Sequence, residues 1–576
     1  MSQKEGKKIT GAEILLESIL AQGEDTVFGY PGGQIMPVYD KMYDYSDRLH
    51  HILVRHEQGA IHAAQGYAGV KGKPGFVIVT SGPGATNVIT GVADAMIDSN
   101  PVVVIAGQVS NAALGTDAFQ ETDLIGLTTP ITKWAHQVRR AEDIAEAVAR
   151  AYYIAGSGRP GPVVLDLTKD AQVGLAEYHE AHCNFIRSYV PVPEASEASI
   201  DEAVKMIDAA EKPFVVFGQG ITHSGAEKEL AAFLDKADIP AGSTLLGLSA
   251  LPNSNPHYVG MLGMHGNIAT NVLTQECDLL IAVGMRFDDR VTGTVSTYAR
   301  QAKKIHIDID ASEIGKNVKV DLGILGDAKP VLAALTKKMK ARKRNTWDAA
   351  IAKCREIEKA KVIDPEINPA SGMIKPGEVV ARVADACDGK AIVVTDVGQN
   401  QMLSARYSRF CQGRSLLSSG GLGTMGFGLP AAIGAKVAAP DRQVCLFVGD
   451  GGLQMTIQEF GTIMQEKTGV KIVLLNNNWL GNVRQWQELF FDRRYSATRM
   501  MNPDFQQIAK AYGIECVNVE NRKDLVPAIQ KMLATDGPFL LNVHVEEEDN
   551  VFPMIPPGKS VNEIMLNAKE KLEYGN

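Results

Sequence analysis

The sequence predicts an α/β protein built from three domains, each a parallel sheet flanked by helices. Short, continuous apolar runs such as FVIVT (76–80), VVVIAG (102–107) and VCLFVGD (444–450) alternate with helical patterns along the chain. Strands that are apolar on both faces are typical of parallel sheets covered by helices. A chain of 576 residues also exceeds what one hydrophobic core usually supports.

Two segments interrupt this alternation and are interpreted as linkers. One is the polar, proline-bearing stretch from Tyr189 to Ser199, and the other is the charged helical run from Lys337 through Lys361. They predict a first domain at residues 1–185, a central domain at 195–345, a third domain at 370–545 and a C-terminal arm at 546–576. The first and third domains each place a glycine-rich turn after a buried strand (TSGPGATN and VGDGGLQMT), which hints at duplicated folds. In parallel sheets of this kind, ligands are expected beyond the carboxyl ends of the strands.

Composition narrows the class of protein. The formal net charge of -9 leaves no broadly basic surface, so we expect no nucleic-acid partner. Seven cysteines without a CxxC pair favour reduced thiols over a disulfide framework. The N-terminus has no apolar signal core, and the apolar runs are too short to cross a bilayer, so we expect a cytoplasmic protein with no membrane partner.

The most specific motif is GDGGLQMT from Gly449, followed by NNN at Asn476 to Asn478, with a buried strand before each. A carboxylate, an amide oxygen and a backbone carbonyl are hard oxygen ligands that suit Mg²⁺. The alternative for either motif alone is an ordinary strand, turn and helix, but the spaced pair favours a metal site.

A second motif, VRHEQGAIHAAQGYA, places Glu57 at the start of an apolar helix. A glutamate in that position ordinarily offsets the helix dipole. It is also suited to proton transfer when a cofactor lies nearby.

The motifs together resemble the thiamine-diphosphate enzymes: GYPGG at Gly29 to Gly33, RHEQ, TSGPGATN, TDVGQNQ, and GDG followed by NN. The central series GQG (218–220), STLLG (243–247), GMLGMHG (260–266), GMRFDDRVTG (284–293), IHIDID (305–310) and LGD (325–327) resembles the FAD-binding domain of acetohydroxyacid synthases within that group. The tail VFPMIPPGKSVNEIM resembles their C-terminal arm, so the likeness extends from about residue 9 to residue 567.

The resemblance implies three cofactors: thiamine diphosphate, Mg²⁺ and FAD. Mg²⁺ would be held by the side chains of Asp450 and Asn477 and by the backbone carbonyl of Trp479. Glu57 would drive tautomerisation of the aminopyrimidine of thiamine diphosphate, and Met425 would bend that cofactor. The other residues implied around thiamine diphosphate are Thr80, Pro83, Asn87, Val397, Gly398, Gln399, Asn400, Gly449, Gly451 and Gly452.

FAD would contact residues of the central domain together with Arg159 of the first domain. The central-domain residues are Gly218, Gly220, Thr244, Leu245, Met264, His265, Gly284, Arg286, Asp308 and Asp327. For Asp308 and Asp327 there is a general reason, because a carboxylate after a strand can bind a ribose hydroxyl or an adenine amine.

The substrate residues implied by the resemblance are basic or apolar. Arg290 would receive the carboxylate of the second keto acid, with Trp486 and Met264 shaping the pocket for its side chain. Gly33, Phe119, Gln120 and Lys169 would complete the catalytic channel. Five positions depart from the family pattern. Asn400 and Met402 stand where relatives have histidine and tryptophan, Gln34 where a small residue is usual, Thr168 where relatives have proline, and Gly452 where they have serine.

The implied reaction is decarboxylation of pyruvate and transfer of the two-carbon unit to pyruvate or 2-ketobutyrate, a step of branched-chain amino acid biosynthesis. Because the family builds its site between subunits, we expect a homodimer or tetramer, with a small regulatory subunit as a possible partner. Two alternatives remain: a flavin-using pyruvate oxidase, and a catalytically idle nucleotide-binding scaffold. RFDDR, Trp486 and the tail argue against the first, and the retained Glu57, Asp450 and Asn477 argue against the second.

Overall fold

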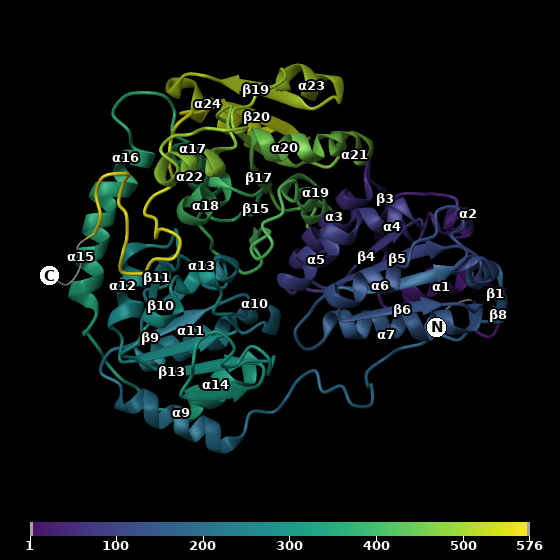
Figure 1. Ribbon diagram of the computed structural model, residues 1–576, viewed down its shortest axis with the longest axis horizontal. Helices are drawn as coiled ribbons and strands as arrows, with labels where there is room; N and C mark the ends of the chain where they lie inside the picture. Colours follow the sequence, from purple (N-terminus) through teal and green to yellow (C-terminus); the bar gives the residue numbers. More distant parts are fainter. Residues whose placement is uncertain (1–3, 573–576) are drawn as a thin grey trace.

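The structure is a computed structural model that describes residues 4–572. It contains three six-stranded sheets, and within each sheet all the strand pairs are parallel. The sheets form three lobes with helices packed around them (Figure 1). The predicted α/β class is therefore confirmed. Within residues 4–572, no helix combines the length and the apolar character needed to cross a membrane.

The first lobe contains the sheet ordered β3-β2-β4-β5-β7-β6. Its strands are β2 (Thr26–Gly29), β3 (His50–Leu53), β4 (Gly75–Val79), β5 (Val102–Gln108), β6 (Trp134–Val138) and β7 (Val163–Thr168). Its main helices are α1 (Gly11–Ala21), α3 (Glu57–Lys71), α5 (Ile89–Ile97) and α7 (Ile144–Gly156). A short antiparallel pair, β1 (Lys8–Thr10) with β8 (Leu175–Glu177), ties the ends of the lobe together.

The third lobe repeats this topology. Its sheet is ordered β16-β15-β17-β18-β20-β19, so counting strands along each lobe gives 2-1-3-4-6-5 in both. The strands are β15 (Ile392–Thr395), β16 (Leu416–Leu417), β17 (Val444–Gly449), β18 (Lys471–Asn476), β19 (Glu515–Val519) and β20 (Phe539–His544). Its helices include α17 (Pro376–Cys387), α18 (Gln399–Tyr407), α19 (Gly428–Ala438), α20 (Asp450–Thr456) and α22 (Gly481–Phe490). The shared strand order agrees with the repeated glycine-rich turn in the sequence.

The middle lobe has a different order, β11-β10-β9-β12-β13-β14, which counts as 3-2-1-4-5-6 and is the dinucleotide-binding arrangement. The strands are β9 (Pro213–Phe217), β10 (Ala241–Ser243), β11 (Tyr258–Met261), β12 (Leu279–Val283), β13 (Lys303–Asp308) and β14 (Leu322–Leu325). Helices α9 (Glu197–Ala209), α10 (Gly220–Ser224), α11 (Glu227–Ala237), α12 (Ile268–Glu276), α13 (Asp289–Thr292) and α14 (Ala328–Lys338) accompany it. In all three sheets the strand order reverses beside the first strand, which is the point where sheets of this kind bind ligands.

The first and third lobes meet through α3 and α19. A Cβ added at Gly66 would lie 2.0 Å from the carbonyl oxygen of Ala431, and one added at Gly434 would lie 1.8 Å from that of Ala63. Glycine is therefore required where the two helices cross at backbone distance. This contact fixes how the two lobes sit in one chain.

The connecting segments run along the outside of the lobes. The chain from the first lobe crosses to the middle lobe and enters α9 at Glu197 (Figure 1). The charged run predicted as the second linker contains the end of α14 and then α15 (Asp348–Glu358), which continues through a π-helical turn into α16 (Asp364–Ile367). The C-terminal segment, yellow in Figure 1, leaves the third lobe after β20 and lies along the middle lobe.

Candidate functional site

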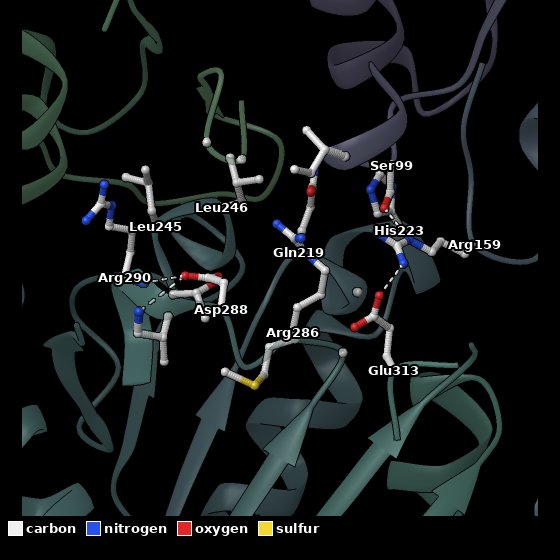
Figure 2. Close-up of a pocket in the computed structure, with 18 of the residues that line it drawn as sticks. Ser99, Arg159, Gln219, His223, Leu245, Leu246, Arg286, Asp288, Arg290 and Glu313 are labelled. Carbon is white, nitrogen blue, oxygen red and sulfur yellow. Dashed lines mark hydrogen bonds and ion pairs between the residues drawn. The ribbon is translucent and has the colours of Figure 1, made fainter. Parts of the chain in front are cut away.

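A cavity of about 790 Å³ opens at the carboxyl ends of the middle sheet, where the three lobes converge (Figure 2). Loops after β9, β12 and β13 form its floor, and residues 420–423 (Gly-Gly-Leu-Gly) of the third lobe and Ser99 of the first border it. The residues predicted around FAD that line it are Arg159, Gly220, Thr244, Leu245, Met264, His265, Gly284, Arg286, Asp308 and Asp327. Gly218 is absent from this lining but packs directly beneath it.

Close backbone packing at the point of strand reversal creates the floor of the cavity. A Cβ at Gly218 would lie 2.5 Å from the carbonyl oxygen of Gly284, and one at Gly220 would lie 2.6 Å from the Gly284 Cα. The turns after β9 and β12 therefore touch without side chains between them. That arrangement leaves room above them for a flat or extended ligand.

One end of the cavity is organised by Arg159. Its guanidinium donates to Ser99 Oγ at 2.9 Å and to Glu313 Oε1 at 2.7 Å, as the dashed lines in Figure 2 show. Asp308 lies near this group, and burial raises the pKa of its carboxyl to about 6.

Two histidines of the cavity wall have ring nitrogens without a protein partner. Nε2 of His223 and Nδ1 of His265 are buried and accept or donate no hydrogen bond within the protein. Burial lowers the pKa of His223 to about 3 and that of His265 to about 4, so both rings are neutral at neutral pH. Unpaired buried polar atoms that line a cavity fit a ligand that supplies the missing hydrogen bonds. These atoms, together with the glycine floor, fit FAD.

His265 was predicted from its motif, whereas His223 was missed. His223 stands one turn into α10, after the GQG turn, and Figure 2 shows it beside Arg159 and Ser99. A lone histidine in a short helix carries no distinctive pattern, so only the fold reveals its place.

The predicted substrate residues gather at the other end of the same cavity. Asp288 accepts from the backbone N–H of Arg290 at 2.9 Å and so caps the short helix α13. The Arg290 side chain is largely exposed, and its Nη1 lies 4.0 Å from Met264 Sδ. Trp486 enters this end from α22 of the third lobe. Arg290, Met264 and Trp486 therefore lie at one end of the cavity, although they come from two lobes.

The loop after β15 brings the predicted diphosphate residues to the edge of the cavity. Val397 and Gly398 line it, and Gly398 has a φ of 109° that favours glycine. A Cβ at Gly398 would meet only Asn482, and one at Gly423 would meet only Val397, within 4 Å. The space between these two loops is thus an open cradle. Asn400 lies behind it, donating to the Val397 carbonyl at 3.0 Å.

Asp396 is a residue that the motif analysis missed. Its buried carboxylate accepts from the backbone N–H groups of Val397, Gly426 and Gly428 at 2.8 to 3.2 Å. It thereby joins the Val397 loop to the turn that carries Met425, whose methyl group approaches Gly451. A Cβ at Gly452 would lie 2.4 Å from Asp396 Oδ1, which explains glycine at that position.

The predicted metal ligands lie together at the ends of the adjacent strands β17 and β18. Asp450 follows β17, is buried, and accepts from Gly451 N at 2.9 Å and from Asn478 N at 2.7 Å. Asn477 Oδ1 accepts from Trp479 N at 3.1 Å. Asn478 between them has a left-handed φ of 59°, a conformation in which asparagine is enriched.

Asn502, which sequence reasoning missed, completes this group. Asn502 Nδ2 donates to Asp450 Oδ2 at 2.7 Å and to Asn476 Oδ1 at 2.9 Å. Within residues 4–572 no three His, Cys, Asp or Glu side chains gather as a metal cluster. The donor set is instead one carboxylate with amide and carbonyl oxygens, which fits Mg²⁺ shared with a diphosphate. Gln399 lies beside it, because a Cβ at Gly481 would meet Gln399 Oε1 at 2.1 Å and Asn477 Nδ2 at 2.8 Å.

Glu57 begins α3 beside the corresponding turn of the first lobe. Asn87 Nδ2 donates to Glu57 Oε2 at 2.9 Å. A Cβ at Gly84, next to Pro83, would lie 3.3 Å from Glu57 Oε1 and 2.7 Å from Thr80 Cγ2. Four predicted residues, Glu57, Thr80, Pro83 and Asn87, are therefore neighbours.

The remaining predicted channel residues lie around this corner with different degrees of exposure. Gln120, with a left-handed φ of 63°, packs its backbone against Gly82. Phe119 is 83% exposed. Gly33 is exposed with open space at its Cβ position, and Lys169 is exposed at the end of β7. The single chain thus brings Gln120 toward the turn but leaves Phe119 and Lys169 facing outward.

The Glu57 and Asp450 groups remain separate in this chain. No hydrogen bond within residues 4–572 joins Glu57, Thr80 or Asn87 to the Asp450 group, and none of these three lines the cavity. The first lobe instead contributes to the cavity through Ile97, Ser99 and Arg159. Nearby, Asp98 accepts from Gly420 N and Gly421 N, both at 2.7 Å, and so fixes the glycine loop on the rim.

Comparison with known proteins agrees with this geometry. Models of the thiamine pyrophosphate enzymes match in three parts: the N-terminal TPP binding domain at residues 9–127, the central domain at 200–335 and the C-terminal TPP binding domain at 396–543. The fold and the site therefore define a thiamine pyrophosphate enzyme.

Relatives define the family more narrowly. The acetolactate synthase large subunit of Lactococcus lactis subsp. lactis (strain IL1403) is 44% identical over 97% of this chain and 96% of its own length. The acetolactate synthase isozyme 2 large subunit of Escherichia coli (strain K12) is 44% identical over 97% and 99%, and the large subunit of Haemophilus influenzae is 40% identical over 98% and 99%. The chain belongs to the acetolactate synthase large-subunit family, and the resemblance inferred from its motifs is confirmed.

Proposed function

We propose that this enzyme decarboxylates pyruvate and joins the two-carbon fragment to pyruvate or 2-ketobutyrate, giving acetolactate or acetohydroxybutyrate. The observation that carries the proposal is that Arg290, Met264 and Trp486 lie at one end of the cavity that Val397 and Gly398 also line. The guanidinium of Arg290, the apolar side chains of Met264 and Trp486, and the proposed diphosphate loop at Val397 and Gly398 thus border one cavity.

The residues of the site have different roles in this reaction. When bound, thiamine diphosphate with Mg²⁺ supplies the carbon nucleophile that adds to the keto carbonyl of pyruvate. Asp450, Asn477 and the Trp479 carbonyl would hold the metal. Glu57 would exchange a proton with the pyrimidine ring, and the hydrogen bond from Asn87 orients its carboxyl group.

The acceptor acid would bind at the exposed end of the cavity. The planar guanidinium of Arg290 matches a carboxylate in a bidentate manner. Trp486 and Met264 would then contact the alkyl group and exclude water from it, while Gln120, Gly33, Phe119 and Lys169 would border the channel. Because a hydrophobic wall separates acids that differ by one methylene only modestly, the enzyme should use both acceptors with a preference.

The oligomer we propose is at least a homodimer in which Glu57 of one chain meets the Asp450 group of another. The separation of the two groups within one chain supports it, as do exposed apolar side chains near both groups. These are Tyr30, Met36 and Phe119 around the first, and Met455, Val483, Phe491 and Met501 around the second. We also propose a regulatory subunit as a partner and a cytoplasmic location, and the location is supported by the seven cysteines, none of which forms a disulfide within residues 4–572.

The test is product analysis with purified protein, thiamine diphosphate, Mg²⁺, FAD and an equimolar mixture of pyruvate and 2-ketobutyrate. Both acetohydroxy acids should form, and FAD should stay oxidised because the reaction has no net redox step. Peroxide with bleaching of the flavin would instead identify an oxidase. Absence of any product would favour an inactive scaffold.

A further inference from the structure

Arg484 is a fully buried cation on α22, the helix that carries Trp486. Its side chain has 0% exposure, and it stands between Asn482 and Trp486, which both line the cavity. Nη1 donates to Glu488 Oε2 at 2.7 Å, while Nη2 donates to the Asp549 carbonyl at 2.7 Å and to Asn550 Oδ1 at 2.6 Å. Burial of a charge costs desolvation free energy, which is offset here by hydrogen bonds from both terminal nitrogens, although Nε has no partner among the described residues. These bonds hold the side chain in one position.

Glu488 completes the contact from the helix side. Asn550 Nδ2 donates to Glu488 Oε2 at 2.9 Å. Partial burial acts to raise the pKa of Glu488, but the hydrogen bonds from Asn550 and Arg484 outweigh it, and the pKa lies below its usual value. The carboxylate is therefore charged at neutral pH and holds Arg484 and Asn550 in one geometry.

The next residue, Gln485, fastens the same segment. Its Oε1 accepts from Val551 N at 2.9 Å and from Gln399 Nε2 at 3.1 Å, and its Nε2 donates to the Val551 carbonyl at 3.2 Å. Residues 549–551 are thus attached to α22 by side chains on two consecutive positions. The attachment also includes Gln399, beside the proposed metal group.

Beyond residue 551 the chain reaches the opposite wall of the cavity. Ile555 N donates to the carbonyl of Met264 at 2.8 Å, and Met264 N donates to the carbonyl of Arg290 at 2.7 Å. Residues 549–555, which we call the strut, therefore connect the helix of Trp486 to the loops of Met264 and Arg290. The two walls belong to different lobes, and the strut is a short direct link between them.

We propose that Arg484 and Asn550 are positioning residues that, through the strut, set the distance between Trp486 and the Arg290–Met264 wall and thereby set the preference for the larger acceptor acid. The inference rests on the proposed function. A pocket distinguishes one methylene by about 10–200-fold only when its walls are held in place, and a displacement of about 1 Å is enough to erode such selectivity.

The experiment is the mixed-acid competition with three variants. Asn550→Ala removes the side-chain hydrogen bonds of Asn550 with Arg484 and Glu488, but leaves Arg484 paired with Glu488 and with the Asp549 carbonyl. Arg484→Lys keeps the positive charge but loses the planar guanidinium. The matched control is Asn562→Ala, which removes a contact of the arm farther along the chain, where Gln275 Nε2 donates to Asn562 Oδ1 at 2.6 Å. The readouts are the ratio of the two products and the total release of carbon dioxide.

We expect Asn550→Ala to reduce the preference for 2-ketobutyrate by about 3- to 10-fold, a part of the range for one methylene. Arg484→Lys should reduce it at least as much, while Asn562→Ala keeps the parental ratio and carbon dioxide release persists in all three. A parental ratio in folded Asn550→Ala would overturn the inference even if Arg484→Lys fails to fold. An equal shift in Asn562→Ala would also overturn it, because any loosening of the arm would then suffice. Wild-type protein that forms neither product would instead contradict the proposed function itself.

Discussion

The cavity and the thiamine-diphosphate residues differ in how much of each one chain assembles. Residues from all three lobes meet in the cavity, and ten of those predicted around FAD line it. The thiamine-diphosphate residues form two groups instead, one around Glu57 and one around Asp450. The difference follows from the arrangement of the lobes. The crevice of the middle sheet borders on the first and third lobes of the same chain, while the crevices of the first and third sheets do not face each other.

This contrast shows that residues whose motifs point to the same cofactor need not lie close together within one chain. Within the chain the first and third lobes meet where α3 and α19 cross at backbone distance, and no hydrogen bond within residues 4–572 joins Glu57, Thr80 or Asn87 to the Asp450 group. A second copy that presents its first lobe to the third lobe of this one would join the two groups.

The largest effect is expected from Glu57→Gln. The change keeps the size of the side chain and the partner Asn87 but removes the acid, so carboligation should fall by about 10²–10⁴-fold. FAD affinity, measured by quenching of flavin fluorescence, should be unchanged because Glu57 does not line the cavity. Near-normal turnover at saturating thiamine diphosphate would show that Glu57 has only a structural role.

The next effect is complementation between two inactive variants. When Glu57→Gln and Asp450→Ala chains are unfolded, mixed equally and refolded together, about half the dimers should be mixed, and each should contain one intact site of two. About a quarter of the wild-type activity should therefore return, measured as acetolactate formed. Each variant refolded alone is the control, and failure of an efficiently refolded mixture to exceed them would place both residues of a site in one chain.

Trp486→Leu should have an effect confined to acceptor choice. Trimming the indole removes the wall that contacts the extra methylene, so the preference for 2-ketobutyrate should fall toward unity, within the roughly 10–200-fold range for one methylene. Arg290, Glu57 and the metal group remain, and acetolactate formation from pyruvate alone should stay substantial. The ratio of the two products is measured by chromatography. An unchanged ratio would mean that Trp486 contributes to packing and not to the choice of acceptor.

The smallest effect concerns the pH dependence of stability at His223. Burial lowers the pKa of His223 from 6.5 to about 3. Below about pH 6.5 the histidine is therefore protonated in the unfolded chain but stays neutral in the folded chain. Stability is therefore lost as the pH falls from about 6.5 toward 3, and His223→Gln should lose less of its Tm than wild type between pH 7 and pH 4.5. His182→Gln, at an exposed histidine, is the control. Parallel Tm curves for wild type and His223→Gln would contradict the assignment.

Much of the candidate site could be predicted because its residues stand at strand ends. Asp450 follows β17 and Asn477 follows the neighbouring β18, so adjacency in a parallel sheet was enough to bring them together. The same holds for Gly220 and Gly284, which follow the paired strands β9 and β12. A buried strand with a glycine-rich turn is a local pattern that sequence displays directly.

Other residues of the site carry no such pattern. Asn502, Asp396 and His223 act through contacts with distant segments, and each is an ordinary polar residue in its own sequence context. Arg484 lies two residues before the predicted Trp486, yet nothing near it in sequence indicates that its partners are the Asp549 carbonyl and Asn550. Gly218 was predicted to touch FAD, and the fold shows that it supports the cavity floor from below.

The sequence by itself determined the α/β class, the parallel strands, the glycine turns and the family, because periodicity and turn chemistry depend on neighbours along the chain. The tertiary structure decided which turns face one another: the middle crevice opens onto both other lobes, whereas the Glu57 and Asp450 crevices stay apart. That outcome depends on how helices from different lobes pack, above all on the glycine contacts of α3 with α19. Close packing of this kind is set by complementary surfaces far apart in sequence, and no local pattern records it.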